Sequence, residues 1–140
     1  MLMLAKITLR LVALFYAYGA AVHILNIASL TGFDWLEAPV KWQVLDVFYL
    51  IVDVIVAVGL FLSWRIAIGA FYVAAISQIF LYTVFREWIL NVPEEFSVSA
   101  EQNVYLDYLV IFHITTVVLV SFALRASASN AEKASAIPER

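Results

Sequence analysis

The sequence predicts an all-α membrane protein, a bundle of four transmembrane helices that run up, down, up and down. Apolar residues make up 65% of the 140 residues, whereas soluble domains contain about 45–50%. Four apolar runs are each long enough to cross a hydrocarbon layer about 30 Å thick, which takes about 20 helical residues. Four such spans use about 80 residues and leave about 60 for loops and ends.

The first span is predicted over residues 9–29. Lys6 and Arg10 come before it, as basic residues do at the head of a secretory signal peptide. The apolar character continues through Ile27, past the usual length of the apolar part of such a peptide. We therefore expect a membrane anchor that is retained.

The second and third spans are predicted over residues 45–64 and 66–85. Only the Ser-Trp-Arg sequence at residues 63–65 lies at their junction. Two spans joined by so few residues must form a tight antiparallel hairpin, with the polar turn at one face of the membrane.

The fourth span is predicted over residues 104–124. Ser99 and Gln102 have the spacing of a capping box, which places the start of this helix near residue 100. Residues 1–125 thus form one four-helix transmembrane domain. Residues 126–140 are rich in Ala, Ser, Glu and Lys and are expected to form a flexible cytoplasmic tail.

The positive charges predict the orientation. Lys41 and Arg86 fall in the two longer connections, and the other basic residues all fall on the opposite side: Lys6, Arg10, Arg65, Arg125, Lys133 and Arg140. Because basic residues accumulate on the cytoplasmic side, we expect both termini in the cytoplasm. We expect the protein to reside in the plasma membrane of a bacterium, that is, its inner membrane.

Composition also excludes several classes of function. The net charge is −3 and the basic residues are scattered, which excludes a nucleic-acid footprint. The absence of cysteine excludes disulfides, thiolate nucleophiles and iron–sulfur clusters. No phosphate-binding loop or nucleophile elbow is present. The expected partners are the lipid bilayer and either another membrane protein or further copies of the chain.

Four strongly polar side chains lie deep within the predicted spans, where such residues cost about 2.5–3.5 kcal/mol each on insertion scales and therefore need a reason. From the rise per residue, Asp53 and His113 lie within about 2 Å of the midplane, with Gln78 about 4 Å and His23 about 6 Å outward. We take these four as the candidates for ligand binding or proton relay.

Helical phase adds secondary candidates. Asp46 and Asp53 are seven residues apart and share a face of the second helix. Tyr16 and His23 have the same spacing on the first helix, with Asn26 beside them.

Phe71, Gln78 and Tyr82 share a face of the third helix. Asp107 and His113 point about 120° apart, so Asp107 is expected at the membrane interface rather than at the site. The secondary candidates are Tyr16, Asn26, Asp46 and Tyr82.

Several interpretations of these polar residues remain open. Asp53, Gln78 and His113 are candidates to hydrogen-bond one another and hold the helices together. Asp53 with His113 or His23 is alternatively a protonatable pair that relays protons or binds the polar head of a quinone. A metal site is not expected, because no His-x-x-x-His or Glu-x-x-His motif is present. A haem is not expected either, since the two histidines differ in depth.

Two stretches resemble the DoxX-like family of small four-helix membrane proteins. Residues 10–19 match its first helix, which opens with an arginine and has a glycine later. Residues 52–70 match its acidic residue, apolar run, Gly-Leu pair and arginine-bearing turn, with Asp53 where glutamate is commoner. The resemblance implies a four-helix bundle, and the family takes its name from a small subunit of a quinol-oxidising or thiosulfate:quinone-type oxidoreductase.

The function expected from these observations is that of a small accessory subunit of a quinone-linked membrane redox assembly. The alternatives are a proton-linked channel or transporter-like protein and a purely structural membrane subunit. The sequence assigns no catalytic residue and no cofactor beyond the quinone that would suit the polar cluster.

Overall fold

The computed structural model describes residues 3–135, and these residues contain helices and no strand. Four helices are long and apolar enough to cross a membrane: α1 (Met3–Ile27), α2 (Val40–Phe61), α3 (Arg65–Thr83) and α5 (Ala100–Ser135). Between α3 and α5 lie the short α4 (Arg86–Leu90) and the 3₁₀ helix η1 (Glu94–Phe96). The predicted all-α bundle of four transmembrane helices is confirmed, and the protein is a multi-pass membrane protein.

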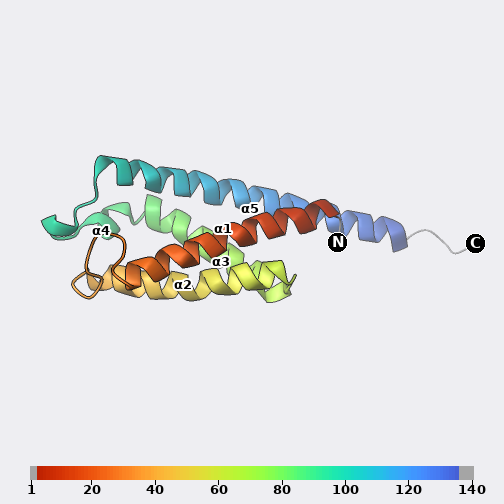
Figure 1. Cartoon of the computed structure of the whole chain (residues 1–140). Helices are drawn as coiled ribbons and strands as arrows, with labels where there is room; N and C mark the ends of the chain where they lie inside the picture. The colour runs from red at the N-terminus through yellow and green to blue at the C-terminus, as the bar shows by residue number, and fades with distance from the viewer. Residues whose placement is uncertain (1–2, 136–140) are drawn as a thin grey trace, which may run out of the picture.

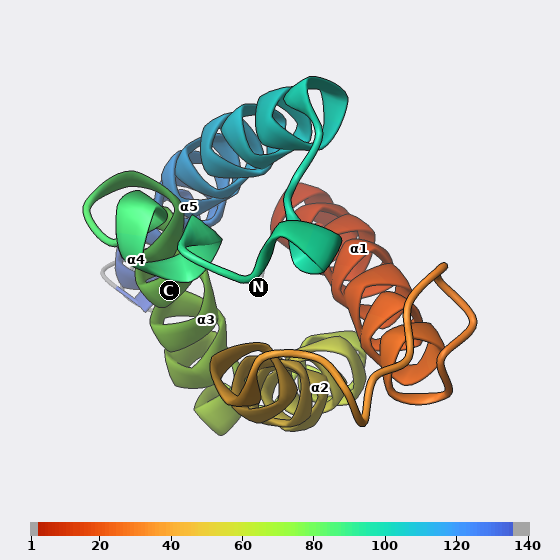
Figure 2. The same cartoon turned by 90° about the vertical axis from the view of Figure 1, so that its left-hand side faces the viewer.

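The four spanning helices run side by side in alternating directions (Figure 1). The start of α1, the end of α5 and the turn between α2 and α3 lie toward one end, which we call the hairpin end. The opposite end carries α4 and η1, and we call it the α4 end. Viewed from the α4 end, α1, α2, α3 and α5 follow one another around a ring (Figure 2).

Each spanning helix begins before the apolar run that predicted it, whereas α1, α2 and α3 end two to three residues before their runs do. α2 begins directly after Pro39, whose extended backbone precedes the first helical residue. At the start of α5, the backbone amide of Gln102 donates to the Ser99 hydroxyl (3.2 Å), and the amide of Ser99 donates to the Gln102 side chain (2.8 Å). The predicted capping box is confirmed.

The end of the fourth helix was placed too early by the sequence analysis. α5 continues to Ser135, whereas its apolar run ends at residue 124. The reason is physical: alanine, lysine and glutamate sustain a helix after its side chains have ceased to be apolar. Of the predicted tail, residues 126–135 are therefore helical, and residues 136–140 lie outside the described residues.

The turn between α2 and α3 is as tight as predicted. The amide of Trp64 donates to the carbonyl of Gly59 (2.7 Å), and Ser63 takes a left-handed backbone conformation (φ 62°). A methyl group added at Gly59 would overlap the Cβ of Ala67. The glycine thus lets the two helices approach closely at the point where the chain reverses.

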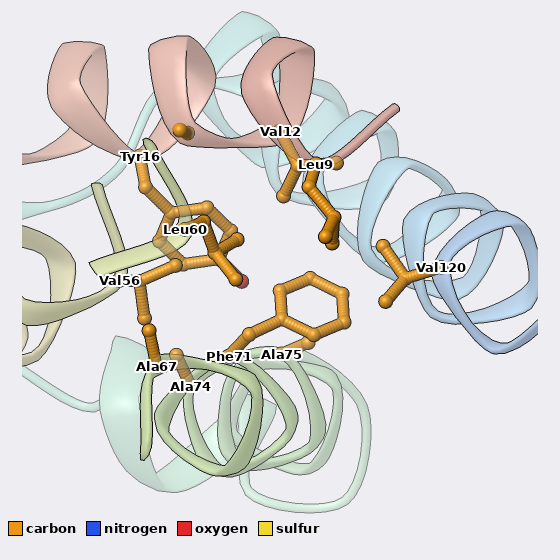
Figure 3. Close-up of a cluster of buried hydrophobic side chains, with 11 residues drawn as sticks. Leu9, Val12, Tyr16, Val56, Leu60, Ala67, Phe71, Ala74, Ala75 and Val120 are labelled. Atoms are coloured by element: carbon orange, nitrogen blue, oxygen red, sulfur yellow. The ribbon is translucent and has the colours of Figure 1, made fainter. Parts of the chain in front are cut away.

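The hairpin half of the bundle is filled by an apolar core, shown in Figure 3. Val56 from α2, Phe71 from α3 and Val120 from α5 are completely buried there, and Leu9 and Val12 from α1 pack against them. This core closes the bundle on the hairpin side and leaves its polar residues in the other half.

Candidate functional site

A cavity of about 330 Å³ lies between the spanning helices in the half of the bundle toward the α4 end. It is called the polar cavity below. All the side chains singled out from the sequence line it: Tyr16, His23, Asn26, Asp46, Asp53, Gln78, Tyr82 and His113. The structure therefore brings together residues of α1, α2, α3 and α5. That these residues bind a ligand or relay protons stays a prediction.

Asp46 is the best-connected carboxylate of the cavity. Its Oδ1 accepts hydrogen bonds from the Asn26 amide (3.0 Å) and from His23 Nδ1 (2.7 Å). Its Oδ2 accepts one from the indole nitrogen of Trp35 (3.1 Å). A carboxylate only accepts, so the proton of the His23 contact sits on Nδ1. These three donors compensate the burial of the Asp46 carboxylate.

His23 joins the two carboxylates of α2. While Nδ1 bonds Asp46, the other ring nitrogen, Nε2, lies 3.9 Å from Oδ2 of Asp53. The ring stacks on Tyr49, with centroids 6.0 Å apart and planes 20° from parallel. The seven-residue spacing of Asp46 and Asp53 thus places both of them beside one imidazole. Of the two histidines suggested as partners of Asp53, the structure brings His23 to it.

Asp53 forms part of the floor of the polar cavity. Only 3% of the residue is exposed, and its Oδ1 has no hydrogen-bond partner within residues 3–135. The Tyr16 hydroxyl is equally buried and equally unpartnered among the described residues. Buried polar atoms of this kind are costly, so two of them beside one cavity need an explanation.

Gly19 of α1 lies against Asp53. A Cβ built at this glycine would lie 2.5 Å from Oδ2 of Asp53, so only a residue without a side chain leaves room for the carboxylate. The sequence analysis assigned Gly19 no role at the site. Gly19 lies three residues after Tyr16 and four before His23, on the same helical face. This spacing could have identified Gly19 as part of the site.

His113 and Gln78 line the cavity from α5 and α3. His113 is 2% exposed, and its Nδ1 donates to the carbonyl of Leu109 (2.6 Å). A neutral ring so bonded leaves Nε2 as an acceptor. Within residues 3–135 no hydrogen bond joins Asp53, Gln78 and His113 to one another. The interpretation that these three side chains hydrogen-bond one another is therefore not supported: each lines the cavity from its own helix.

Outside this group, the predicted faces divide between the cavity and the core. Tyr82 of α3 lines the cavity, whereas Phe71 on the same face packs in the apolar core. The ring of Tyr16 meets Phe71 edge-on at 5.8 Å (Figure 3), so Tyr16 marks the boundary between the two regions. Asp107 does not line the cavity; it pairs with Arg86 and its side chain is 55% exposed.

Tyr49 and Trp35 belong to the site, although the sequence analysis did not place them there. Tyr49 stacks on His23, and its hydroxyl donates to Ser77 of α3 (3.1 Å). Helical phase was a usable signal for Tyr49, which lies between Asp46 and Asp53. Trp35 lies in the connection between α1 and α2. Its bond to Asp46 depends on the path of the 28–39 connection, which no sequence period encodes.

The segment containing α4 covers part of the cavity at the α4 end. Ile89 and Leu90 line the cavity from this segment. Two side chains of α2 hold it down: Lys41 donates to the carbonyls of Trp88 and Asn91, and the Trp42 indole donates to the carbonyl of Ile89 (2.9 Å). The cover is therefore attached to α2 through backbone carbonyls.

The walls are rich in aromatic side chains and carry no lysine or arginine among the described residues. Tyr18 of α1 and Tyr105 of α5 both line the cavity and are 58% and 50% exposed. Gln102, at the start of α5, also lines the cavity and is exposed, so the cavity is open on the side of α1 and α5. No group of three or more His, Asp, Glu or Cys side chains that could hold a metal ion occurs between residues 3 and 135.

No protein-family model, no curated protein and no solved structure matches the chain.

Proposed function

We propose that this protein binds a quinol in the polar cavity and acts as a small accessory subunit of a membrane redox assembly. The observation that carries the proposal is the unpartnered Oδ1 of Asp53, buried at the floor of an aromatic cavity beside a second acceptor, His113 Nε2. A quinol presents two hydroxyl donors on a flat ring. Such a ring suits a cavity with aromatic walls and a few polar groups.

The way into the cavity also favours a ligand dissolved in lipid. Tyr18 and Tyr105 lie at an opening between two membrane-spanning helices. A quinol with an apolar tail can enter there with its ring first, while the tail stays in the hydrocarbon.

The two carboxylates and His23 supply a path for a proton from the ligand. The His23 ring lies between the carboxylates of Asp53 and Asp46. A proton that a ligand hydroxyl passes to Asp53 can therefore reach Asp46 through this one imidazole. The 3.9 Å between Nε2 and Asp53 exceeds a hydrogen bond, so transfer requires a small approach of the two side chains. In this proposal a partner subunit receives the electrons.

The setting of the protein is part of the same proposal. We place both termini in the cytoplasm of a bacterium and the α4 end outside the plasma membrane, because the basic residues concentrate toward the hairpin end. Membership of the DoxX-like family, with its link to quinone oxidoreductases, and assembly with another membrane protein or with further copies of the chain are proposed together with this function.

Quinol binding tests the proposal directly. A decyl-substituted benzoquinol, kept reduced, is titrated into the protein in a maltoside detergent, and binding is followed through quenching of tryptophan fluorescence, since Trp42 lines the cavity. Replacing Asp53 by Asn is expected to weaken binding roughly 10- to 100-fold, because a hydrogen bond to a charged group contributes about 1.5–3 kcal/mol.

Asp107→Asn is the matched control, since Asp107 lies outside the cavity. It should leave quinol binding unchanged. Equal binding by wild type and Asp53→Asn, or no binding by the wild type, would contradict the proposed function. Loss of folding in Asp53→Asn, with no quinol binding by the wild type, would instead favour the structural alternative.

A further inference from the structure

One buried carboxylate of the polar cavity, that of Asp53, has an oxygen without a hydrogen-bond partner among residues 3–135. Asp46 is fully compensated by its three nitrogen donors. Asp53 has only the His23 ring, 3.9 Å from one oxygen, and nothing within residues 3–135 on the other. The basic residues nearest to the α4 end are engaged elsewhere: Lys41 with backbone carbonyls and Arg86 with Asp107. No lysine or arginine among the described residues pairs with Asp53.

We propose that the polar cavity also binds a monovalent organic cation, a protonated amine on a flat apolar body. Its ammonium group donates to Oδ1 of Asp53, the buried acceptor that lacks a partner. This ligand class goes beyond the quinol, because the ligand itself carries a charge and pairs with the Asp53 carboxylate as an ion.

The walls suit such a cation in two ways. A cluster of aromatic side chains faces the cavity: Phe15, Tyr16, Tyr18, Tyr49, Tyr82 and Tyr105. Ring faces attract cations, and the attraction is larger where water is excluded. The same rings offer an apolar surface to the body of the ligand. An anion would meet two carboxylates with no basic partner, so the cavity selects by sign of charge.

The shape limits the ligand to a small molecule with its charge at one end. The apolar core below Tyr16 and Asp53 closes the cavity toward the hairpin end. The charged group therefore goes deepest, next to Asp53, and the apolar body points toward the opening between Tyr18 and Tyr105.

Three probes of similar size and different charge test this inference. 2-Phenylethylamine, 2-phenylethanol and 3-phenylpropanoate are titrated calorimetrically into the protein in a neutral maltoside detergent, at a pH where the amine is protonated. We expect the amine to bind at least about tenfold more tightly than the alcohol, which corresponds to about 1.4 kcal/mol, and the carboxylate to bind least. Asp53→Asn should abolish the preference for the amine, and Asp107→Asn should retain it.

Equal binding of amine and alcohol by the wild type, or binding of neither, overturns the inference whatever the variants do. If Asp53→Asn does not fold, Gly19→Ala takes its place, because the added methyl displaces the Asp53 carboxylate; an unchanged preference for the amine would then overturn the inference. The decyl benzoquinol is measured on the same samples. If the quinol binds but the amine is not preferred, the inference is wrong and the proposed function still holds. If the amine is preferred but the quinol does not bind, the proposed function is wrong and the cation site still holds.

Discussion

At the scale of the residue, the site depends on the absence of a side chain as much as on the presence of one. Gly19 leaves the space that Asp53 occupies, and the backbone of α1 passes close to the carboxylate. Glycine is otherwise a poor choice within a helix, where it costs about 1 kcal/mol relative to alanine. Its position opposite the buried Asp53 explains why glycine occurs here despite this cost.

Gly19→Ala is therefore expected to weaken quinol binding while it leaves the helices intact. The new methyl forces Asp53 out of its rotamer, and displacements of this kind cost about 1–3 kcal/mol, or roughly 5- to 150-fold in affinity. Gly69→Ala is the matched control, because a Cβ at Gly69 meets no other atom within 4 Å. Quinol titrations and circular dichroism of both variants measure the effect; equal affinities in the two would show that Gly19 does not position Asp53.

Sequence reasoning predicted part of this site, and the limits have physical causes. The cost of polar groups in hydrocarbon was enough to select Asp53 and His113, and the helical period was enough to place Asp46 with Asp53. Neither reveals which residues of different helices meet. The pairing of Asp53 with His23 rather than His113 is a property of how α1 packs against α2, and the bond from Trp35 depends on a loop without a repeating pattern.

At the scale of the element, the spans were predictable because apolar length decides whether a helix crosses a membrane. Their ends were less predictable, since helix propensity and hydropathy end at different residues, as α5 shows beyond residue 124. The hairpin between α2 and α3 was predictable from the three residues at its junction. Its close packing at Gly59 required the structure.

Gly59→Ala is expected to destabilise the α2–α3 hairpin. The added methyl would overlap the Cβ of Ala67, which is completely buried and cannot move aside easily. Overpacking typically costs about 1–3 kcal/mol. Loss of helicity on titration with a denaturing detergent measures the change. Gly69→Ala, on the same pair of helices but in open space, should be as stable as the wild type or more so; equal stability of the two variants would contradict the close approach.

At the scale of the whole molecule, the bundle divides into an apolar half and a polar half. The core of Phe71 and its neighbours fills one, and the polar cavity fills the other. The placement of the basic residues, in turn, is the basis for the proposed orientation of the α4 end.

The proposed orientation can be tested because the chain contains no cysteine, so any introduced cysteine is unique. Glu95→Cys in η1 and Ser129→Cys near the end of α5 place an exposed thiol at opposite ends of the bundle. In intact bacterial cells, a membrane-impermeant maleimide should label the Glu95→Cys variant, and the Ser129→Cys variant only after the cells are opened. The opposite pattern would reverse the orientation.

The apolar core in the hairpin half makes the site a cul-de-sac. A molecule that enters between Tyr18 and Tyr105 cannot leave through the hairpin half, so occupancy follows its concentration on the side of the membrane next to the α4 end. When two molecules compete for the cavity, the first must dissociate before the second can bind, so the residence time of the first sets the rate at which the second binds.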